Sequence, residues 1–236
     1  MFGRATFVKT LKAAAGMFLM LLLFPIFLIF LFKWIAPPMS SFMVQKKVEL
    51  LFSDAADTTI YHRWADYEKI SENMKIAVVA AEDQKFPDHF GFDFESIRKA
   101  LKYNERHERV RGASTITQQV AKNLFLWPGR SFPRKGLEAY LTMLIELIWS
   151  KQRILEVYLN IAEMGDRIYG VEAAANIYFN RSASQLNRDQ AALLSAVLPN
   201  PARYSVRKPS PYVRHRKSWI LHQISRLGGI QYIGNL

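Results

Sequence analysis

The stretch RGASTITQQVAKNLFL, residues 111–126, contains three hydroxyl residues and two adjacent glutamines but no acid. On a helix that starts at Thr115, its polar residues gather on one side and its apolar residues on the other. The polar side comprises Thr115, Gln118, Gln119 and Lys122, and the apolar side comprises Ile116, Val120 and Leu124. Amides and hydroxyls around one cation suit a ligand with sugar hydroxyls or phosphate oxygens. The alternative is an ordinary helix whose polar side faces water.

Helical patterns fill most of the chain after residue 70. Helix N-caps are expected at Ser71, Asp93 and Asn187, and one long helix is expected from Arg134 to about Asn160. Strand signals are sparse, because no alternating run is bounded by an Asn-Gly or Asp-Gly turn. With 236 residues the chain is long enough to bury a core. The sequence therefore predicts a mainly α domain.

A run of 20 uncharged residues, 13–32, lies near the N-terminus. At about 1.5 Å per residue, it is long enough for a helix to cross a hydrocarbon core of about 30 Å. No acid accompanies the basic residues before this run, so the positive-inside rule places the N-terminus in the cytoplasm. We expect a cytoplasmic segment at 1–12, a single-pass inner-membrane anchor at 13–36, a connector at 37–64 and a periplasmic domain at 65–236.

The stretch EDQKFPDHFGFD, residues 82–93, follows the apolar segment IAVVAA. The carboxylate of Glu82 is therefore expected to project from a dry surface, where burial raises its pKa and makes it a usable general base. The alternative is that Glu82 and Asp83 are ordinary solvated acids at a helix end. The stretch fits no metal-ligand spacing, so no protein-bound metal is expected.

Positive charge is concentrated in one part of the chain. Between residues 98 and 135 there are ten Lys or Arg and two acids, a net charge of +8, within a chain of net charge +12. Such a surplus favours a phosphorylated ligand or an anionic membrane surface as partner. No nucleic-acid-binding motif is present, so nucleic acid is not an expected partner. Arg134 and Glu138 are spaced either for a simple ion pair or for a phosphate-binding arginine held by a carboxylate.

Five segments together are more specific than any of these features alone. They are EDQKFPDHFG, GASTITQQVAKNLFL, RKGLE, KQRILEVYLN and AALLSAVLPNP. Their order and approximate spacing resemble the five motifs of the peptidoglycan glycosyltransferases. The chain is similar to the monofunctional biosynthetic form, which has one membrane anchor and no penicillin-binding domain. The resemblance covers roughly residues 65–205. It implies a lysozyme-like, mainly helical domain with a groove between two lobes.

The resemblance also implies a reaction. The substrate is lipid II, a disaccharide-pentapeptide on undecaprenyl pyrophosphate, and its 4-hydroxyl attacks the anomeric carbon of the growing chain with inversion. The implied partners are lipid II, the nascent glycan strand, membrane lipids and other cell-wall synthesis or division proteins. No cofactor is certain, and a divalent cation, Mg²⁺ or Mn²⁺, at the pyrophosphate is one implied option.

Roles carry over to this chain by motif position. Glu82 corresponds to the general base, and Glu138 to a second acid that orients the cations or a bound metal. Lys122 and Arg134 correspond to the cations on the departing pyrophosphate. The implied sugar and phosphate binders of the groove are Ser114, Thr115, Gln118 and Gln119. The loop of the first motif contains Asp83, Phe86, His89 and Gly91, and the residues expected behind the substrate-contacting groups are Lys135, Glu156 and Asn160.

Two other functions stay open at this point. A lysozyme-like hydrolase would use Glu82 as an acid to cut glycan, and a membrane-anchored scaffold would bind envelope components without turnover. A hydrolase has no pyrophosphate to bind, so the pair Lys122 and Arg134 argues against the first.

Overall fold

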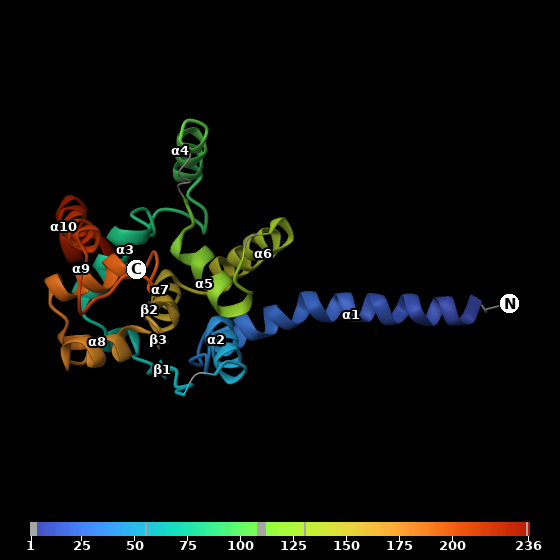
Figure 1. The fold of residues 1–236 in the computed structure, drawn as a ribbon. Helices are drawn as coiled ribbons and strands as arrows, with labels where there is room; N and C mark the ends of the chain where they lie inside the picture. The colour runs from blue at the N-terminus through green and yellow to red at the C-terminus, as the bar shows by residue number, and fades with distance from the viewer. Residues whose placement is uncertain (1–3, 55, 108–111, 130, 235) are drawn as a thin grey trace.

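The computed structural model describes residues 4–54, 56–107, 112–129, 131–234 and 236, and at helix positions 4–6, 8, 13–15, 18, 21 and 22 it describes the backbone only. The prediction of a mainly α chain is confirmed (Figure 1). The helices are α1 (Arg4–Leu31), α2 (Ser41–Leu51), α3 (Glu72–Glu82), α4 (Phe94–Asn104), α5 (Ile116–Phe125), α6 (Phe132–Ile148), α7 (Lys151–Ile161), α8 (Val171–Phe179), α9 (Arg188–Val197) and α10 (Pro211–Arg226). Short 3₁₀ turns lie at η1 (Tyr67–Lys69), η2 (Ala183–Gln185) and η3 (Gly229–Ile233).

Two groups of helices pack around the core. In the first, α3, α9 and α10 pack on one another, and α3 is buried along its whole middle part from Met74 to Ala80. In the second, α5 packs on α6 and α7, with α2 beside it. Figure 1 shows α4 standing away from both groups. The burial of α3 explains why residues 76–81 form an unbroken apolar run and why the last residue of the helix, Glu82, is only 13% exposed.

The predicted helix starts are confirmed. The side chains of Ser71, Asp93 and Asn187 accept hydrogen bonds from backbone N–H groups in the first turns of α3, α4 and α9. Each bond satisfies a donor that the helix itself leaves unpaired.

The prediction of one helix from Arg134 to about Asn160 is wrong. The chain leaves the helix at Trp149, whose ψ of 150° is extended, and Ser150 then caps α7 by accepting from the N–H of Arg153 at 3.2 Å. The apolar periodicity continues through this break, so the pattern alone did not reveal it. A serine within an otherwise helical run was the available signal.

A small sheet went unpredicted. It contains β1 (Tyr61–His62), β2 (Glu163–Gly165) and β3 (Ile168–Tyr169) in the order β1-β3-β2, with β1 parallel and β2 antiparallel to β3. Tyr61 pairs with Ile168. Strands of two or three residues are too short to show alternation in the sequence. The predicted connector at 37–64 therefore contains both α2 and β1.

The last turn of α1 is fastened to the body of the protein. The indole N–H of Trp149 donates to the carbonyl of Ile29 at 2.7 Å. The guanidinium of Arg153 donates to the carbonyls of Phe32, at 2.8 and 3.0 Å, and Ile35, at 2.8 Å. The carbonyl of Ile29 is one of the groups that a helix leaves unpaired at its C-terminal end, and Phe32 and Ile35 lie in the turn that follows α1. Side chains of the α6–α7 junction thus cap α1.

A search of the described residues finds no helix with both the length and the hydropathy of a membrane span. The predicted anchor at 13–36 and the cytoplasmic segment at 1–12 fall on α1, and residues 1–3 together with the side chains of 13–15, 18, 21 and 22 lie outside the described residues. The anchor and its orientation stay predictions.

Asn160 of α7 holds the segment that leads into α3. Its Oδ1 accepts from the N–H of Ala65 and its Nδ2 donates to the carbonyl of Ala65, both at 2.8 Å. Glu156, one turn earlier on α7, accepts from the N–H of Tyr67 at 3.1 Å. Because Ala65 and Asn160 are buried, these bonds have no solvent replacement.

The substitution Asn160→Ala is expected to lower the free energy of unfolding by about 1–3 kcal/mol, because both backbone groups of Ala65 lose their partner inside the protein. Urea denaturation of the purified variant measures this loss. Asn176→Ala, at an exposed position of α8, is the matched control and should stay within about 0.5 kcal/mol of the parent chain. Equal stability of the two variants would contradict the assigned role of Asn160.

Candidate active site

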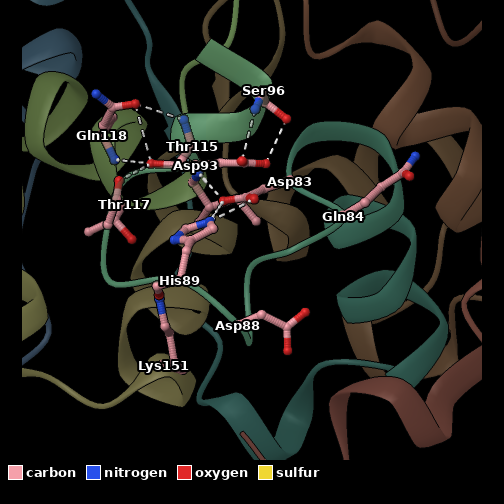
Figure 2. Close-up of polar contacts among 12 residues, drawn as sticks. Asp83, Gln84, Asp88, His89, Asp93, Ser96, Thr115, Thr117, Gln118 and Lys151 are labelled. Carbon is pink, nitrogen blue, oxygen red and sulfur yellow. Dashed lines mark hydrogen bonds and ion pairs between the residues drawn. The ribbon is translucent and has the colours of Figure 1, made fainter. Parts of the chain in front are cut away.

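Asp83 joins the end of α3 to the start of α5 (Figure 2). Its carboxylate accepts from the N–H of Ile116, the first residue of α5, at 2.9 Å, and contacts Nε2 of His89 at 2.9 and 3.0 Å. Asp83 is buried, so these contacts replace solvation of its charge. A carboxylate at a helix N-terminus also lies at the favourable end of the helix dipole. The junction fixes where Glu82, the preceding residue, lies relative to α5.

Thr115 and Gln118 form a capping box at the same junction. The hydroxyl of Thr115 accepts from the N–H of Gln118 at 3.2 Å and donates to the carbonyl of Gly91 at 2.7 Å, while the amide oxygen of Gln118 accepts from the N–H of Thr115 at 3.0 Å. Thr115 is buried and its hydroxyl is fully used. Of the residues predicted to bind sugar or phosphate, Thr115 therefore lies inside the protein as a helix cap.

Glu82 lies in a largely buried position, with its side chain 13% exposed. Its Oε2 accepts from the side-chain amide of Gln119 at 3.0 Å, and its Oε1 accepts from the guanidinium of Arg216 at 3.1 Å. The phenol of Tyr158 donates to the amide oxygen of Gln119 at 3.2 Å, which directs the amide NH₂ toward Glu82. Burial raises the pKa of the Glu82 carboxyl above its ordinary value, although the contacts with Gln119 and Arg216 oppose the shift.

A pocket of about 320 Å³ opens beside Gln119. It is lined by Phe42, Ser114, Gln118, Gln119, Lys122, Pro128, Gly129, Arg134, Lys135 and Glu138. The residues come from α2, from the segment just before α5, from α5 and α6, and from the loop between α5 and α6. We call this space the cation pocket, because three of the lining side chains are basic and one is acidic. Ser114 also lines a neighbouring pocket of about 290 Å³ that extends to α4.

The charges in the cation pocket are unequally paired. Arg134 donates to Oε2 of the buried Glu138 at 2.8 Å, and Lys135 contacts the other oxygen. No hydrogen bond or ion pair of Lys122 is found within the described part of the chain; its ammonium lies 5.5 Å from the ring of Phe42. Burial lowers the pKa of Lys122, and the neighbouring Arg134 adds to this effect, while Glu138 opposes it. Lys122 therefore has a charge that an anionic ligand could balance.

Two of the four predicted loop residues of the first motif, Phe86 and Gly91, are packing elements. Phe86 is fully buried, with its ring 6.4 Å from that of His89 in an edge contact. Gly91 has a φ of +78°, and a Cβ there would lie 2.7 Å from a methyl carbon of Thr142. Gly91 is thus required both by its backbone conformation and by the closeness of α6.

One buried acid behind the site was missed. Glu146 of α6 accepts from the hydroxyl of Thr117 at 2.5 Å and from the ammonium of Lys151 at 2.8 Å. Lys151 also donates to the carbonyl of His89 at 2.6 Å. The only signal in the sequence was a Glu beside the apolar residues in the second half of α6. The predicted supporting residues Glu156 and Asn160 do not line the cation pocket and hold residues 65–67 instead.

The acids of the site do not form a metal cage. No group of three or more His, Cys, Asp or Glu side chains suited to a metal ion is present in the described ranges. In the cation pocket the lining acid is Glu138, and both its oxygens contact basic side chains. Magnesium-like ions prefer several oxygen ligands, so the protein side chains alone do not fit such an ion.

A buried carboxylate one hydrogen-bonded residue away from a cation pocket is the arrangement of an enzyme that transfers a group from an anionic leaving group. The family model described as Transglycosylase matches residues 51–225. Among the relatives, biosynthetic peptidoglycan transglycosylases from Pseudomonas putida W619 and Escherichia coli E24377A are 53% and 58% identical, covering 89% and 83% of this chain and 89% and 81% of their own lengths. One from Salmonella arizonae is 56% identical over 86% of this chain and 84% of its own length. The chain therefore belongs to the family of the biosynthetic peptidoglycan transglycosylases.

The substitution Lys122→Met is expected to weaken ligand binding without lowering the stability of the protein. Removing a partly buried ammonium without a hydrogen-bonded partner should leave the melting temperature unchanged or raise it. Binding of inorganic pyrophosphate, measured by calorimetry, should weaken by about 10- to 100-fold, the worth of one charge-assisted hydrogen bond. Lys46→Met, which removes a lysine paired with Glu49 on the outside of α2, should bind as the parent chain does. Unchanged pyrophosphate affinity of Lys122→Met would refute the view that Lys122 contacts an anionic ligand in the cation pocket.

Proposed function

We propose that this chain is a peptidoglycan glycosyltransferase that polymerises lipid II into linear glycan strands. Membership of the family and the names of the relatives support the activity. The observation that supports the location of the site is the contact of Gln119 with Glu82, since Gln119 also lines the cation pocket. A general base and a cluster of cations for a leaving group are thus adjacent. The lysozyme-like, two-lobed architecture is part of this proposal, and the two packed groups of helices are compatible with it.

In this proposal Glu82 accepts the proton of the attacking 4-hydroxyl. The hydroxyl oxygen forms a bond to the anomeric carbon of the donor, and the bond from that carbon to the pyrophosphate oxygen breaks, with inversion. Each carboxylate oxygen of Glu82 accepts one protein hydrogen bond, which leaves capacity on both for a hydroxyl donor. A raised pKa suits this task, because a stronger base removes a hydroxyl proton more readily.

Lys122 and Arg134 bind the departing pyrophosphate in this proposal. Negative charge builds up on the leaving oxygens as the bond breaks, and fixed cations in a partly buried pocket stabilise that charge most effectively. Glu138 positions Arg134 and Lys135 through its two oxygens. Ser114 and Gln118 would contact the same ligand, since both line the pocket.

We propose that any divalent cation enters with the substrate. Phosphate oxygens and water would supply most of its ligands, and Glu138 is the nearest carboxylate in the pocket. Such an ion would add positive charge at the leaving group. The side chains Lys122 and Arg134 supply charge at the same place without it.

The hydrolase alternative has less support. A glycan hydrolase cleaves a sugar–sugar bond and has no anionic leaving group, so it does not explain three basic side chains around one space. The relatives in the comparison are described as biosynthetic.

We further propose that the chain is held in a bacterial inner membrane by residues 13–36, with its catalytic domain in the periplasm. The uncharged run 13–32 and a substrate carried on a lipid support this location. Partners would then be lipid II, the nascent strand, membrane lipids and other proteins of cell-wall synthesis or division.

The full-length chain should convert lipid II into lysozyme-sensitive polymer, and Glu82→Gln should reduce the rate by about 10²- to 10⁴-fold, the usual worth of a general base. Because burial raises the pKa of Glu82 and only the ionised form accepts a proton, the parent rate should fall on acidification at a pH above the ordinary range of glutamate. Glu68→Gln, an exposed acid in η1, is the control. A Glu82→Gln variant with parental activity would exclude the base, and shortening of preformed glycan by a chain that leaves lipid II intact would favour hydrolysis.

The membrane location predicts a second result. The full-length chain, expressed in bacteria, should stay with membranes after alkaline carbonate washing, and protease added to spheroplasts should digest residues 65–236. Release of the chain by carbonate, or protection of these residues, would contradict the anchor or its orientation respectively.

A further inference from the structure

Arg216 of α10 contacts Glu82 from a part of the chain that lies after all five sequence motifs. Its Nη2 donates to Oε1 of Glu82 at 3.1 Å and to the carbonyl of Ala81 at 3.4 Å. The side chains are only 21% and 13% exposed, so solvent screens their interaction weakly. The guanidinium lies 5.9 Å from the ring of Trp219, one turn further along α10. α10 packs directly on α3, and this packing brings the two residues together.

The two oxygens of Glu82 are held from opposite helices. Arg216 on α10 donates to Oε1, and Gln119 on α5 donates to Oε2. Gln119 is itself oriented by Tyr158 of α7. The rotation of the carboxyl group is therefore restricted at both oxygens, and a hydroxyl that approaches it meets a fixed geometry.

Three charged side chains face Glu82. Asp83, directly after α3, disfavours the carboxylate form, while Lys122 of α5 and Arg216 of α10 favour it. Tyr158 of α7 faces it as a neutral phenol, because burial raises the pKa of that phenol well above its ordinary value. The packed side of α9 is formed by small and aliphatic residues and a serine, and Tyr232 of η3 donates to Gln84 and Asp88. Within the described residues, Arg216 is the cation in hydrogen-bond contact with Glu82.

These contacts oppose the effect of burial. Transfer of Glu82 out of water disfavours its charge, and its place at the C-terminal end of α3 adds the negative end of a helix dipole. Without a cation in contact, the carboxyl group would bind a proton more readily and lose its capacity to accept another.

We propose that Arg216 is a positioning residue for Glu82, which orients the carboxylate and keeps it anionic so that it can take the proton of the acceptor hydroxyl. The proposal rests on the role of Glu82 given above. Arg216 does not touch the reacting atoms in this scheme, and its effect passes through the carboxylate alone.

The test is the pH dependence of lipid II polymerisation by full-length Arg216→Met and Arg216→Lys. Arg216→Met should lower kcat at neutral pH by about tenfold and move the acidic limb of kcat to higher pH by about one pH unit, because a contacting opposite charge lowers a carboxyl pKa by about that much or more. The KM for lipid II should change by less than about twofold, since no substrate contact is lost. Arg216→Lys should return most of the limb to its parental position.

Arg214→Met is the matched control, because this exposed arginine of the same helix donates only to the carbonyl of Pro209. For Arg214→Met, the acidic limb of the pH profile and kcat should equal those of the parent chain. A merely structural role of Arg216 would lower activity equally at all pH values, and a role in substrate binding would raise KM; either result would overturn the proposal. Melting temperatures and pyrophosphate binding report whether each variant is folded, and Arg216→Lys provides the test if Arg216→Met is not.

The double variant Glu82→Gln/Arg216→Met separates the two hypotheses. If Arg216 acts through Glu82, adding Arg216→Met to Glu82→Gln should change the residual rate by less than about twofold. A further tenfold loss would overturn the proposal. If Glu82→Gln alone keeps parental activity, the role of Glu82 fails first. If Glu82→Gln is inactive but the limb of Arg216→Met stays in place, only the inference about Arg216 fails.

Discussion

The candidate site depends on one buried ion–dipole contact, between the carboxylate of Asp83 and the first N–H of α5 at Ile116. This contact ties the end of α3 to the start of α5, and His89 holds the same carboxylate from the following loop. Glu82, the proposed base, precedes Asp83 by one residue, and Gln119 lies one helical turn after Ile116. The carboxylate of Asp83, which is not proposed to react, thus sets the distance between the proposed base and the glutamine that donates to it.

The cation pocket shows how the fold accommodates uncompensated charge. Arg134 and Lys135 share Glu138, so two positive groups are balanced by one acid, and Lys122 is left against an aromatic ring. A pocket optimised for stability alone would contain another acid or an apolar side chain. Its excess charge is understandable when a substrate brings the missing negative charge, and binding then relieves a repulsion that folding has already established.

The sequence predicted the mainly helical class and the helix caps, because these depend on local signals. The roles of the site residues came from the resemblance to a family and stay predictions. Caps such as Ser71 and the two-sided pattern of residues 115–124 are visible within single turns. Arg216 and Glu146 were missed because only tertiary packing brings them to the site. Thr115 was read as a ligand group because its hydroxyl resembles one, whereas its contact with Gly91 depends on a loop 24 residues away. At the break, the indole of Trp149 contacts α1, and this contact is likewise invisible in the local sequence.

The hydrogen bonds that hold the C-terminal end of α1 and the turn after it have a mechanical consequence. Trp149 and Arg153 bind the carbonyls at Ile29, Phe32 and Ile35, so the helix is not a loose tether. With 28 residues it forms a lever about 42 Å long whose inner end is fixed to α6 and α7. A neighbouring molecule that bound the outer part of this helix would orient the rest of the described chain with it. The orientation of the protein would then depend on a contact remote from its chemistry.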